Sequence, residues 1–455
     1  MNAQSRSRFT QEDKAIANNY FPGATADVPT EDPPIKVVFV SISFDPEPGA
    51  VMGLPLAKYL QGLGSYDVTV LTAIPWYPIG KRYPGYKLRL HQWELIDGVR
   101  VLRVPLYPSH DQSAFRRALT YLSFTVNAIV FGLPRLGPVD VVYYFDSLPT
   151  TGFIAFLLRI WRGAASVQHI GDLWPDTVLE SGMLPAKLGN VVQSVVGGWC
   201  KFLYRRHHAI TVASPGLRQM LVGRGVTPNK IFVVHTWAFE SVFFPDAADP
   251  AATREMNSAN RFTVLYAGNL GPLQGLETVV DAAALLLEHS NIQIAFVGSG
   301  QSEAALRKRA AALGLSNINF LGSRPLHRMN AFNNSADALL IHLRDIPLMR
   351  STTPSKTQVA MASARPILMG VAGDAADLLR EAGAGIAFAP EDPAAMADAI
   401  LRLSLLSYDE RKAMGDAGRR YYERTMSLSV GTARLGRLIN EAALAGRKNK
   451  GSSPN

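Results

Sequence analysis

Short, continuous apolar runs alternate with longer amphipathic stretches along most of this chain. The first clear run is IKVVFVSI at residues 35–42, and helical spacing over 51–64 leads to a second run, YDVTVLTA, at 66–73. Further runs, each separated from the last by a helical stretch, lie at 99–104, 139–145, 165–170 and 209–214. Strands that are apolar throughout are typical of parallel sheets, which helices bury on both faces. The pattern predicts a doubly wound, Rossmann-like α/β domain over residues 33–242.

The alternation stops at residues 243–260, whose sequence FFPDAADPAATREMNSAN we interpret as a linker. It then starts again, and predicts a second Rossmann-like domain over 261–428, with strands beginning near residues 262, 292, 318, 336, 366 and 385. We expect a C-terminal helix at 429–445 that packs back toward the N-terminal domain. Residues 1–32 lack apolar periodicity and are expected to form a disordered arm, and 446–455 a flexible tail.

Length and composition agree with two globular domains. A chain of 455 residues is too long for one ordinary core, and 47% of its residues are hydrophobic against 18% charged. The single cysteine, Cys200, excludes an internal disulfide and fits a reducing cytosol. The first residues contain no apolar core of the kind found in signal peptides.

The charge balance points to anionic partners. The formal net charge is +9 and the pI is near 9.5, which favours nucleotides, phosphorylated intermediates or an acidic membrane face. Basic residues occur in small scattered clusters without interleaved aromatic residues, and no zinc-ligand spacing occurs. Nucleic-acid binding is therefore disfavoured.

Four turns follow strands of the predicted second domain. Two are glycine turns, at Gly268–Gly271 and Gly298–Gly300, and the others are FLGSRP at 320–325 and TTPSK at 352–356. Strand ends of a parallel sheet share one edge, so these turns are expected to converge. At the last turn, Lys356, the Ser355 hydroxyl and free N–H groups of a helix start would form an anion site; the alternative is a loop ordered only by packing. The spacing is not that of a dinucleotide-binding fingerprint.

These motifs carry a family resemblance. The succession VLYAGNLGPLQGLETVVDAA, IAFVGSGQSEAAL, INFLGSRP, ADALLIHLRDIPL and TTPSKTQVAMASARPIL resembles retaining glycosyltransferases of the GT-B fold, family GT4. In the first half, SISFDPEPGA, YDVTVLTAIPWYPIGKRYPGY, GVRVLRVPLYPS and GDLWPDT are similar to the branch that builds bacterial surface polysaccharides, including colanic acid and N-acetylfucosamine transferases. The similarity spans residues 35–440. It implies two Rossmann-like domains facing each other across a cleft.

The resemblance implies that the second domain binds a nucleotide-sugar donor, with UDP as the expected nucleotide. The diphosphate would be held by Gly268, Asn269, Gly271, Pro354, Ser355 and Lys356. The base and ribose would be lined by Gly298, Ser299, Gly300 and Arg324. Lys356 and the helix start would stabilise the departing diphosphate, so that neither a metal nor a permanently bound cofactor is required.

Two departures from the family pattern stand in this region. The paired glutamates of most GT4 members are replaced by Ser351 and Val359, and the lysine that many carry in the first glycine turn is replaced by Gln274. Asp345 could compensate for a missing glutamate, or it could be an ordinary exposed loop aspartate.

The first domain is expected to bind the acceptor. Asp45, Glu47 and Gly49 follow the first strand, where the carboxylates could accept hydrogen bonds from sugar hydroxyls or lie idle in a surface loop. The family's catalytic histidine is replaced by Gly171, whereas Asp172 matches, so Asp172 is the preferred catalytic residue with His169 as a second candidate. His169 could equally be an ordinary buried histidine. No covalent nucleophile is assigned, because retention in this family is explained by same-face attack.

Residues 115–137 predict a helix that is apolar on nearly all sides, with Arg116, Arg117 and Arg135 at its ends. Such a helix is either buried or lies in a membrane interface, and it is too short to span a bilayer. Because the family's acceptors are polyprenyl-diphosphate-linked glycans, we expect a cytoplasmic enzyme bound peripherally to the inner membrane, with 151–163 on the same surface. Two alternatives remain: a nucleotide-sugar epimerase of the same fold, and a non-catalytic nucleotide-sugar-binding protein.

Overall fold

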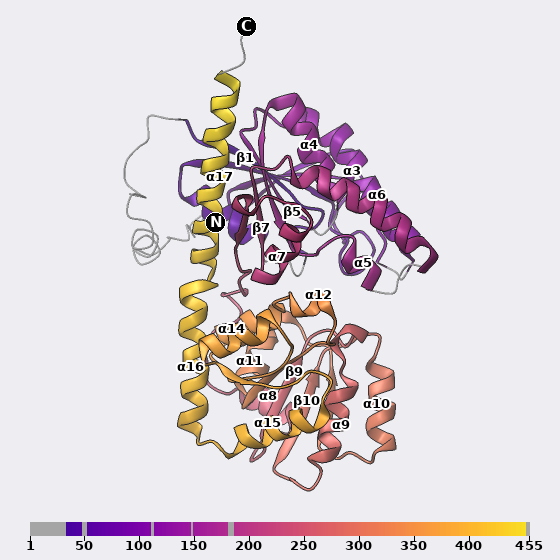
Figure 1. The fold of residues 1–455 in the computed structure, drawn as a ribbon, viewed down its shortest axis with the longest axis vertical. Helices are drawn as coiled ribbons and strands as arrows, with labels where there is room; N and C mark the ends of the chain where they lie inside the picture. Colours follow the sequence, from indigo (N-terminus) through magenta and orange to yellow (C-terminus); the bar gives the residue numbers. More distant parts are fainter. Residues whose placement is uncertain (1–32, 48–51, 111–112, 147–148, 181–185, 452–455) are drawn as a thin grey trace. The chain divides into compact units, whose positions relative to one another are not determined.

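A computed structural model describes residues 33–47, 52–110, 113–146, 149–180 and 186–451. The arm expected at residues 1–32 lies outside this range. The chain divides into two compact units, one made of residues up to Val212 with Leu221–Val234 and the segment from Leu428 onward, the other of Ala213–Met220 with His235–Ser427. Each unit is built on one sheet (Figure 1).

The sheet of the first unit has the strand order β3-β4-β2-β1-β5-β6-β7-β8. All neighbouring pairs are parallel except β3 with β4. The apolar runs lie in the core; Val40, Val70 and Val142, for example, are fully buried. The strands are β1 (Ile35–Val40), β2 (Tyr66–Ala73), β3 (Gln92–Ile96), β4 (Val99–Val104), β5 (Val141–Asp146), β6 (Ala165–Ile170), β7 (Ala209–Val212) and β8 (Ile231–Val233).

The helices in this part of the chain are α2 (Leu54–Gly62), α3 (Ala114–Asn127), η1 (Ala128–Gly132), η2 (Leu133–Arg135), α4 (Thr151–Arg162), α5 (Asp176–Glu180), α6 (Ala186–Tyr204), α7 (Pro215–Gly223) and η3 (Pro228–Lys230). The last helix of the chain is α17 (Leu428–Gly451), drawn in yellow (Figure 1). It contacts α2, β5 and β6. The Tyr66 hydroxyl donates a 3.0 Å hydrogen bond to the carbonyl of Gly436 on this helix. The final helix therefore packs in the first unit, and it extends through residues 446–451, where a flexible tail was expected.

The hairpin β3–β4 was not expected from the apolar pattern. Its turn is Asp97-Gly98, and both residues have positive φ, 49° and 85°, as the two-residue turns that match strand twist require. On β3 exposed positions alternate with half-buried ones, because successive side chains of a strand point to opposite faces. None of them is fully buried, because β3 is the edge strand of the sheet. The Asp-Gly pair was the available signal for this hairpin.

The sheet of the second unit is wholly parallel, in the order β11-β10-β9-β12-β13-β14. Consecutive strands run outward from β9 in one direction and from β12 in the other, so the winding reverses between these two strands. Ligands of such sheets bind beyond the carboxyl ends of the strands at that reversal. The strands are β9 (Phe262–Ala267), β10 (Ile292–Val297), β11 (Ile318–Gly322), β12 (Ala338–His342), β13 (Ile367–Gly370) and β14 (Gly385–Ala387).

Helices on both faces bury this second sheet, and its core includes Val264, Phe296 and Leu340 (Figure 1). They are α8 (Pro250–Met256), η4 (Pro272–Gln274), α9 (Glu277–Leu285), α10 (Glu303–Ala312), η5 (Leu326–Arg328), α11 (Met329–Asn334), α12 (Pro347–Arg350), α13 (Ser355–Ala362), α14 (Asp374–Ala382), α15 (Pro393–Leu405) and α16 (Tyr408–Thr425). The prediction of two doubly wound α/β domains is confirmed.

The segment 243–260 differs from the linker that its composition suggested. It contains α8, whose N-terminus is capped by the Asp249 side chain accepting from the Ala252 N–H at 2.6 Å. Ala252 and Met256 are fully buried in the second unit. The proline and asparagine residues that suggested a linker instead mark the ends of a short packed helix. Pro250 stands in its first turn, and Asn257 adopts a left-handed conformation just after it.

Candidate active site

The two glycine turns of the second unit pack directly against each other. Gly268 and Gly298 have φ values of 139° and 143°, which side-chain-bearing residues rarely adopt. A Cβ atom on Gly298 would lie 1.9 Å from the carbonyl oxygen of Gly268, and one on Gly300 would lie 2.5 Å from that of Leu270. Only glycine permits this approach. The expected convergence of these turns at one sheet edge is thus present in the structure.

Lys356 extends from α13 to the first of these turns. A Cβ atom on Gly268 would lie 2.7 Å from Lys356 Cε and 3.2 Å from its Nζ. The ammonium lies 5.0 Å from the centre of the Tyr266 ring, and among the described residues no carboxylate forms an ion pair with it. Although part of its surface is accessible, desolvation lowers the pKa of Lys356 to about 8. A desolvated cation without an anionic partner is suited to receiving an anion.

The start of α13 adds backbone donors to the same place. Pro354 holds the N-cap position with an extended backbone, and Ser355 and Lys356 are the first helical residues. The first N–H groups of a helix lack partners within it and carry the positive end of its dipole. Glycine turn, lysine and helix start therefore form one electropositive corner at the reversal between β9 and β12.

The backbone donors of the first glycine turn are largely used within the protein. The Gly268 N–H donates to the carbonyl of Val297 at 2.8 Å, and the Gly271 N–H donates to Gln274 Oε1 at 3.1 Å. The expectation that these two N–H groups grip a diphosphate is therefore corrected. Gln274, at the position of the family lysine, caps its own turn, and the positive charge comes instead from Lys356. Asn269 remains exposed beside this corner.

Arg324 also differs from expectation. Its Nε donates to Glu255 on α8 at 3.0 Å, and its Nη1 donates to the carbonyls of Leu321 and Ser323 at 2.6 and 3.1 Å. The guanidinium is thus committed to anchoring its turn rather than lining a base or ribose. The Ser323 hydroxyl donates to Ser299 Oγ at 2.8 Å, which joins this turn to the second glycine turn.

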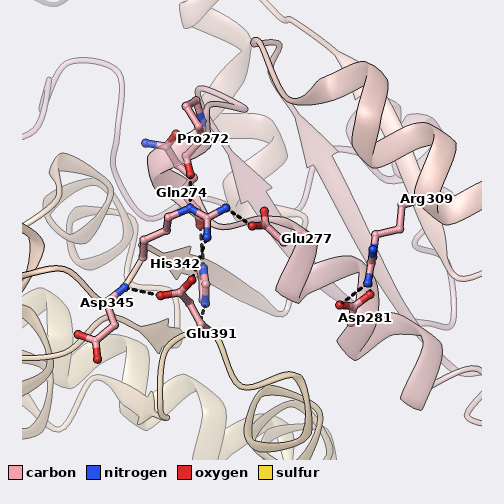
Figure 2. Close-up of polar contacts among 9 residues, drawn as sticks. Pro272, Gln274, Glu277, Asp281, Arg309, His342, Asp345 and Glu391 are labelled. Carbon is pink, nitrogen blue, oxygen red and sulfur yellow. Dashed lines mark hydrogen bonds and ion pairs between the residues drawn. The ribbon is translucent and has the colours of Figure 1, made fainter. Parts of the chain in front are cut away.

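The last residue of β12 and residues just after it form a polar network with η4, which follows the first glycine turn (Figure 2). His342 Nδ1 lies 2.7 Å from the carbonyl oxygen of Gln274, and the Arg344 Nε donates to that of Pro272 at 2.8 Å. Arg344 also forms ion pairs with Glu277 and Glu391. The sequence motifs did not point to these residues. The available signal was the position of His342 and Arg344 at or just after the end of a strand at the reversal of the sheet.

Asp345 does not stand free. Its carboxylate pairs with Arg350 through two hydrogen bonds of 2.6 and 2.8 Å, and its N–H donates to Glu391 Oε2 at 2.8 Å. The hydrogen bonds from Arg350 lower the pKa of Asp345. The carboxylate is therefore already paired with Arg350, the last residue of α12, and compensation for a missing family glutamate has no support from its contacts.

In the first unit, Glu47 is a buried loop anchor. Its side chain is 4% exposed, and its carboxylate accepts hydrogen bonds from the N–H groups of Phe44, Trp76 and Tyr77 at 2.9, 2.7 and 2.6 Å. Burial raises the pKa of Glu47. These three partners are backbone groups of the loops after β1 and β2, which supports a structural role in place of the expected contact with sugar hydroxyls.

Replacing Glu47 by glutamine should destabilise the protein. The amide keeps the shape but presents N–H donors to backbone donors, so we expect the free energy of unfolding to fall by about 2–3 kcal/mol. Urea denaturation at pH 7 would measure this, with Asp45→Asn as the matched control. An acceptor-binding role for Glu47 would be indicated instead if stability were unchanged while the acceptor KM rose.

Asp45 lies partly exposed after β1, and its carbonyl accepts a hydrogen bond from the buried Arg103. Burial raises the pKa of the Asp45 carboxyl more than the charge of Arg103 lowers it. Of the expected acceptor-binding residues, Asp45 therefore has a carboxylate within reach of a ligand, whereas Gly49 lies outside the described residues.

His169 and Asp172 have opposite environments. His169 lies on β6 with no exposed surface, its ring stacked on Phe145 and its Nδ1 2.8 Å from Thr211 Oγ1. Burial lowers its pKa to about 4. The alternative of a buried core histidine therefore describes His169, and its catalytic assignment is corrected. Asp172 lies just beyond the strand end and its side chain is exposed. Desolvation by the surrounding protein nevertheless raises the pKa of its carboxyl.

Two family models match the chain. The one described as "Glycosyl transferase 4-like domain" matches residues 50–237, and "Glycosyl transferases group 1" matches residues 261–405. Together they cover most of both units. The chain belongs to the GT4 glycosyltransferases. It is accordingly an enzyme of the GT-B fold, and the resemblance found in its motifs is confirmed.

Individual relatives agree with this membership. The colanic acid biosynthesis glycosyl transferase WcaI of Escherichia coli K12 is 26% identical over 407 residues, which is 86% of this chain and 96% of WcaI. Sucrose-phosphate synthase from Thermosynechococcus elongatus has a TM-score of 0.66 at 15% identity, over 90% of this chain and all of that one. Anabaena Alr3699/HepE, solved in complex with UDP and glucose, has a TM-score of 0.63 at 14% identity, covering 89% and 99% of the two chains. The two structures establish the fold of this glycosyltransferase.

Proposed function

We propose that this glycosyltransferase moves a sugar from a UDP-linked donor to a lipid-linked glycan in bacterial surface polysaccharide biosynthesis, with retention at the anomeric carbon. The observation that carries the proposal is the electropositive corner of the second unit, where Lys356, without an ion-pair partner among the described residues, meets Gly268 and the start of α13. The similarity to WcaI, whose name assigns it to colanic acid biosynthesis, and the UDP bound to HepE support the substrate classes.

The chemistry follows from where charge develops. The bond between the anomeric carbon and the phosphate oxygen breaks, an acceptor hydroxyl oxygen bonds to the same face of that carbon, and its proton passes to the departing phosphate oxygen. Negative charge grows on the diphosphate during this step. The Lys356 ammonium and the helix dipole lower the barrier because they are already oriented toward that charge. Among the described residues, no cluster of His, Cys, Asp and Glu is arranged to hold a metal ion.

The acceptor side of the proposal rests on the first unit. Asp172 is exposed after β6, and its charge acts on Tyr121 of α3, where it adds to burial in raising the tyrosine pKa. Asp172 thus lies within electrostatic range of α3. An acceptor glycan whose lipid end rests on that helix would have its sugar end near this carboxylate.

The surface of α3, α4 and α6 fits a membrane face. These helices neighbour one another, through contacts of α3 with α4 and aromatic contacts of Phe153 and Phe156 with Trp199. Their sequences contain no aspartate or glutamate but several lysines and arginines. Their exposed apolar side chains are Phe115, Leu119, Leu122, Val126, Phe153, Ile160, Trp161, Val191 and Val195. Apolar and basic groups together favour peripheral binding to anionic lipid on the cytoplasmic side.

None of the helices in the described part of the chain is both long enough and apolar enough to cross a membrane.

The decisive experiment measures ligand binding and turnover together. Purified protein would be screened against nucleotide sugars by thermal shift, since a ligand that binds the folded state raises its melting temperature. UDP release and transfer to a polyprenyl-diphosphate-linked acceptor would then be assayed. Stabilisation with acceptor-dependent UDP release supports the proposal. Interconversion of the donor sugar would indicate an epimerase, and stabilisation without turnover a binding protein.

Donor binding should depend on pH through Lys356. Because desolvation lowers its pKa to about 8, the amine of the free enzyme is charged below that pH and loses its proton above it. We expect the affinity for UDP to fall about tenfold between pH 7 and pH 9, as the protonated fraction falls. Isothermal titration would measure the profile. The Lys356→Met variant should bind weakly at both pH values, and a pH-dependent fall in that variant would assign the titration to another group.

A further inference from the structure

We propose that His342 and Arg344 form a clasp that positions η4 (Pro272–Gln274), the turn directly after the first glycine turn, and shields the donor's diphosphate from two neighbouring carboxylates. The inference rests on the proposed donor site and adds two positioning residues to it. His342 is the last residue of β12 and Arg344 follows it, at the reversal of the second sheet, and neither belongs to the electropositive corner itself.

The first observation is that three successive carbonyls of the turn accept from the clasp. His342 Nδ1 binds the carbonyl of Gln274 at 2.7 Å, the Arg344 N–H donates to that of Leu273 at 3.0 Å, and the Arg344 Nε donates to that of Pro272 at 2.8 Å. A 3₁₀ turn of three residues has too few internal hydrogen bonds to define its own position. The end of β12 therefore sets where this turn lies.

The second observation is that His342 is fixed in one tautomer. Its Nδ1 faces a carbonyl oxygen, so this nitrogen carries the proton, and its Nε2 accepts the Glu391 N–H at 3.1 Å. Burial lowers the pKa of His342, which favours this neutral form. Gly275, with φ of 56°, allows the chain to close over the ring, because a Cβ there would lie 3.1 Å from His342 Cε1. Both ring nitrogens are thus used to join the turn to the loop after β14.

The third observation is electrostatic. Arg344 pairs with Glu391 at 2.9 Å and also with Glu277, at the start of α9 (Figure 2). These carboxylates would otherwise present two negative charges beside η4, which follows the glycine turn of the electropositive corner proposed to bind an anionic donor. The guanidinium offsets that charge while its Nε holds the turn. Arg344 therefore acts on the donor both through geometry and through charge, although it is not itself a catalytic residue.

The clasp is tested by replacing Arg344 in the full chain. Arg344→Met should weaken UDP binding about tenfold or more, as expected for the loss of charge-assisted hydrogen bonds, and should speed hydrogen exchange at amides 271–276. Arg344→Lys, which keeps the charge but not the planar fork, should recover part of the affinity. Because Arg344 is partly exposed, its variants are expected to fold, whereas His342 is buried and would test stability as well.

Arg309→Met is the matched control. Arg309 forms a two-hydrogen-bond ion pair with Asp281 of α9, at 2.6 and 2.9 Å, and lies away from the turn (Figure 2). It should leave UDP binding and exchange at 271–276 unchanged. The double variant Arg344→Met/Glu391→Gln separates the charge effect from the positioning effect, because it removes a negative charge without restoring the hydrogen bond to Pro272. Its affinity for UDP should recover in part relative to Arg344→Met, while hydrogen exchange at 271–276 should stay fast.

The outcomes separate this inference from the donor site. If Arg344→Met binds UDP as tightly as Arg309→Met and its exchange at 271–276 is unchanged, the clasp is wrong. If wild type fails to bind any UDP-linked ligand while Arg344→Met still exchanges faster at 271–276, the positioning of the turn is supported and the proposed donor is wrong.

Discussion

Replacing Lys356 by methionine is expected to reduce UDP affinity and sugar transfer by at least about a hundredfold. The ammonium is the cation placed at the first glycine turn, and removing one preorganised group that stabilises transition-state charge lowers turnover by about 10²–10³. Methionine keeps most of the length and apolar bulk of the side chain, so the packing on Gly268 is retained. Transfer assays with saturating donor and UDP titration calorimetry would measure the two losses.

The same substitution should stabilise the unliganded protein. Desolvation lowers the pKa of Lys356 to about 8 in the folded state, against an ordinary value near 10.4. Below pH 8 the amine is protonated in both folded and unfolded states, so the full desolvation penalty opposes folding; it is released as pH rises from about 8 to 10. At pH 7 we therefore expect Lys356→Met to raise the free energy of unfolding by roughly 1–3 kcal/mol.

Lys308→Met provides the matched control, since Lys308 is an exposed lysine on α10 of the same unit. It should change neither stability nor UDP affinity. A Lys356→Met protein that binds UDP like wild type would overturn the placement of the donor site. If Lys356→Met lost activity as expected but its free energy of unfolding fell, the amine would have a structural partner in the folded protein.

Changing the exposed apolar residues of α3 to serine should release the enzyme from membranes. The variant replaces Phe115, Leu119, Leu122 and Val126, which are 78%, 39%, 52% and 55% exposed. Each large apolar side chain buried in lipid contributes about 1.5–3 kcal/mol, so binding to vesicles containing anionic lipid should fall by more than about a hundredfold even if insertion is partial. Vesicle co-sedimentation at several salt concentrations would measure it. Folding should be little affected because these side chains are already accessible.

A second serine variant controls for the loss of surface hydrophobicity. Leu285, Leu287, Leu313 and Leu405 of the second unit are 57%, 40%, 45% and 85% exposed. Replacing these four should leave vesicle binding unchanged. Equal binding by wild type and the α3 variant would refute the membrane surface, whereas equal loss in both variants would indicate nonspecific adsorption.

The sequence predicted most of the fold because the strands and helices are marked by residues next to one another in the chain. Apolar runs bounded by glycine mark buried parallel strands, and their restart after residue 260 marks a second sheet. The hairpin at Asp97-Gly98 and helix α8 were missed although their turn and cap residues were present. In both places a short element was hidden by its polar or proline-containing neighbours, and only packing on the sheet decided that it forms.

The candidate site was predicted unevenly. Lys356 at a helix start and glycine at strand ends were found because each depends on residues next to it in sequence. Arg324, Glu47 and His169 were predicted to contact ligands, but each contacts the protein instead. Arg324 donates to Glu255, and Glu47 accepts from the N–H groups of Trp76 and Tyr77. His169 stacks on Phe145 and is hydrogen-bonded to Thr211. A polar side chain after a strand faces either a ligand or a neighbouring loop. The sequence of one strand does not say which loop lies beside it.

The sequence by itself determined two doubly wound α/β domains, family membership and an electropositive helix start. Only the tertiary structure decided that Lys356 meets Gly268, and that His342 and Arg344 hold the turn that follows. The physical reason is the strand order: β9 and β12 are neighbours at the reversal of the sheet. Residues far apart along the chain become partners there, and hydrogen bonds and desolvation then determine which charges stay available to a ligand.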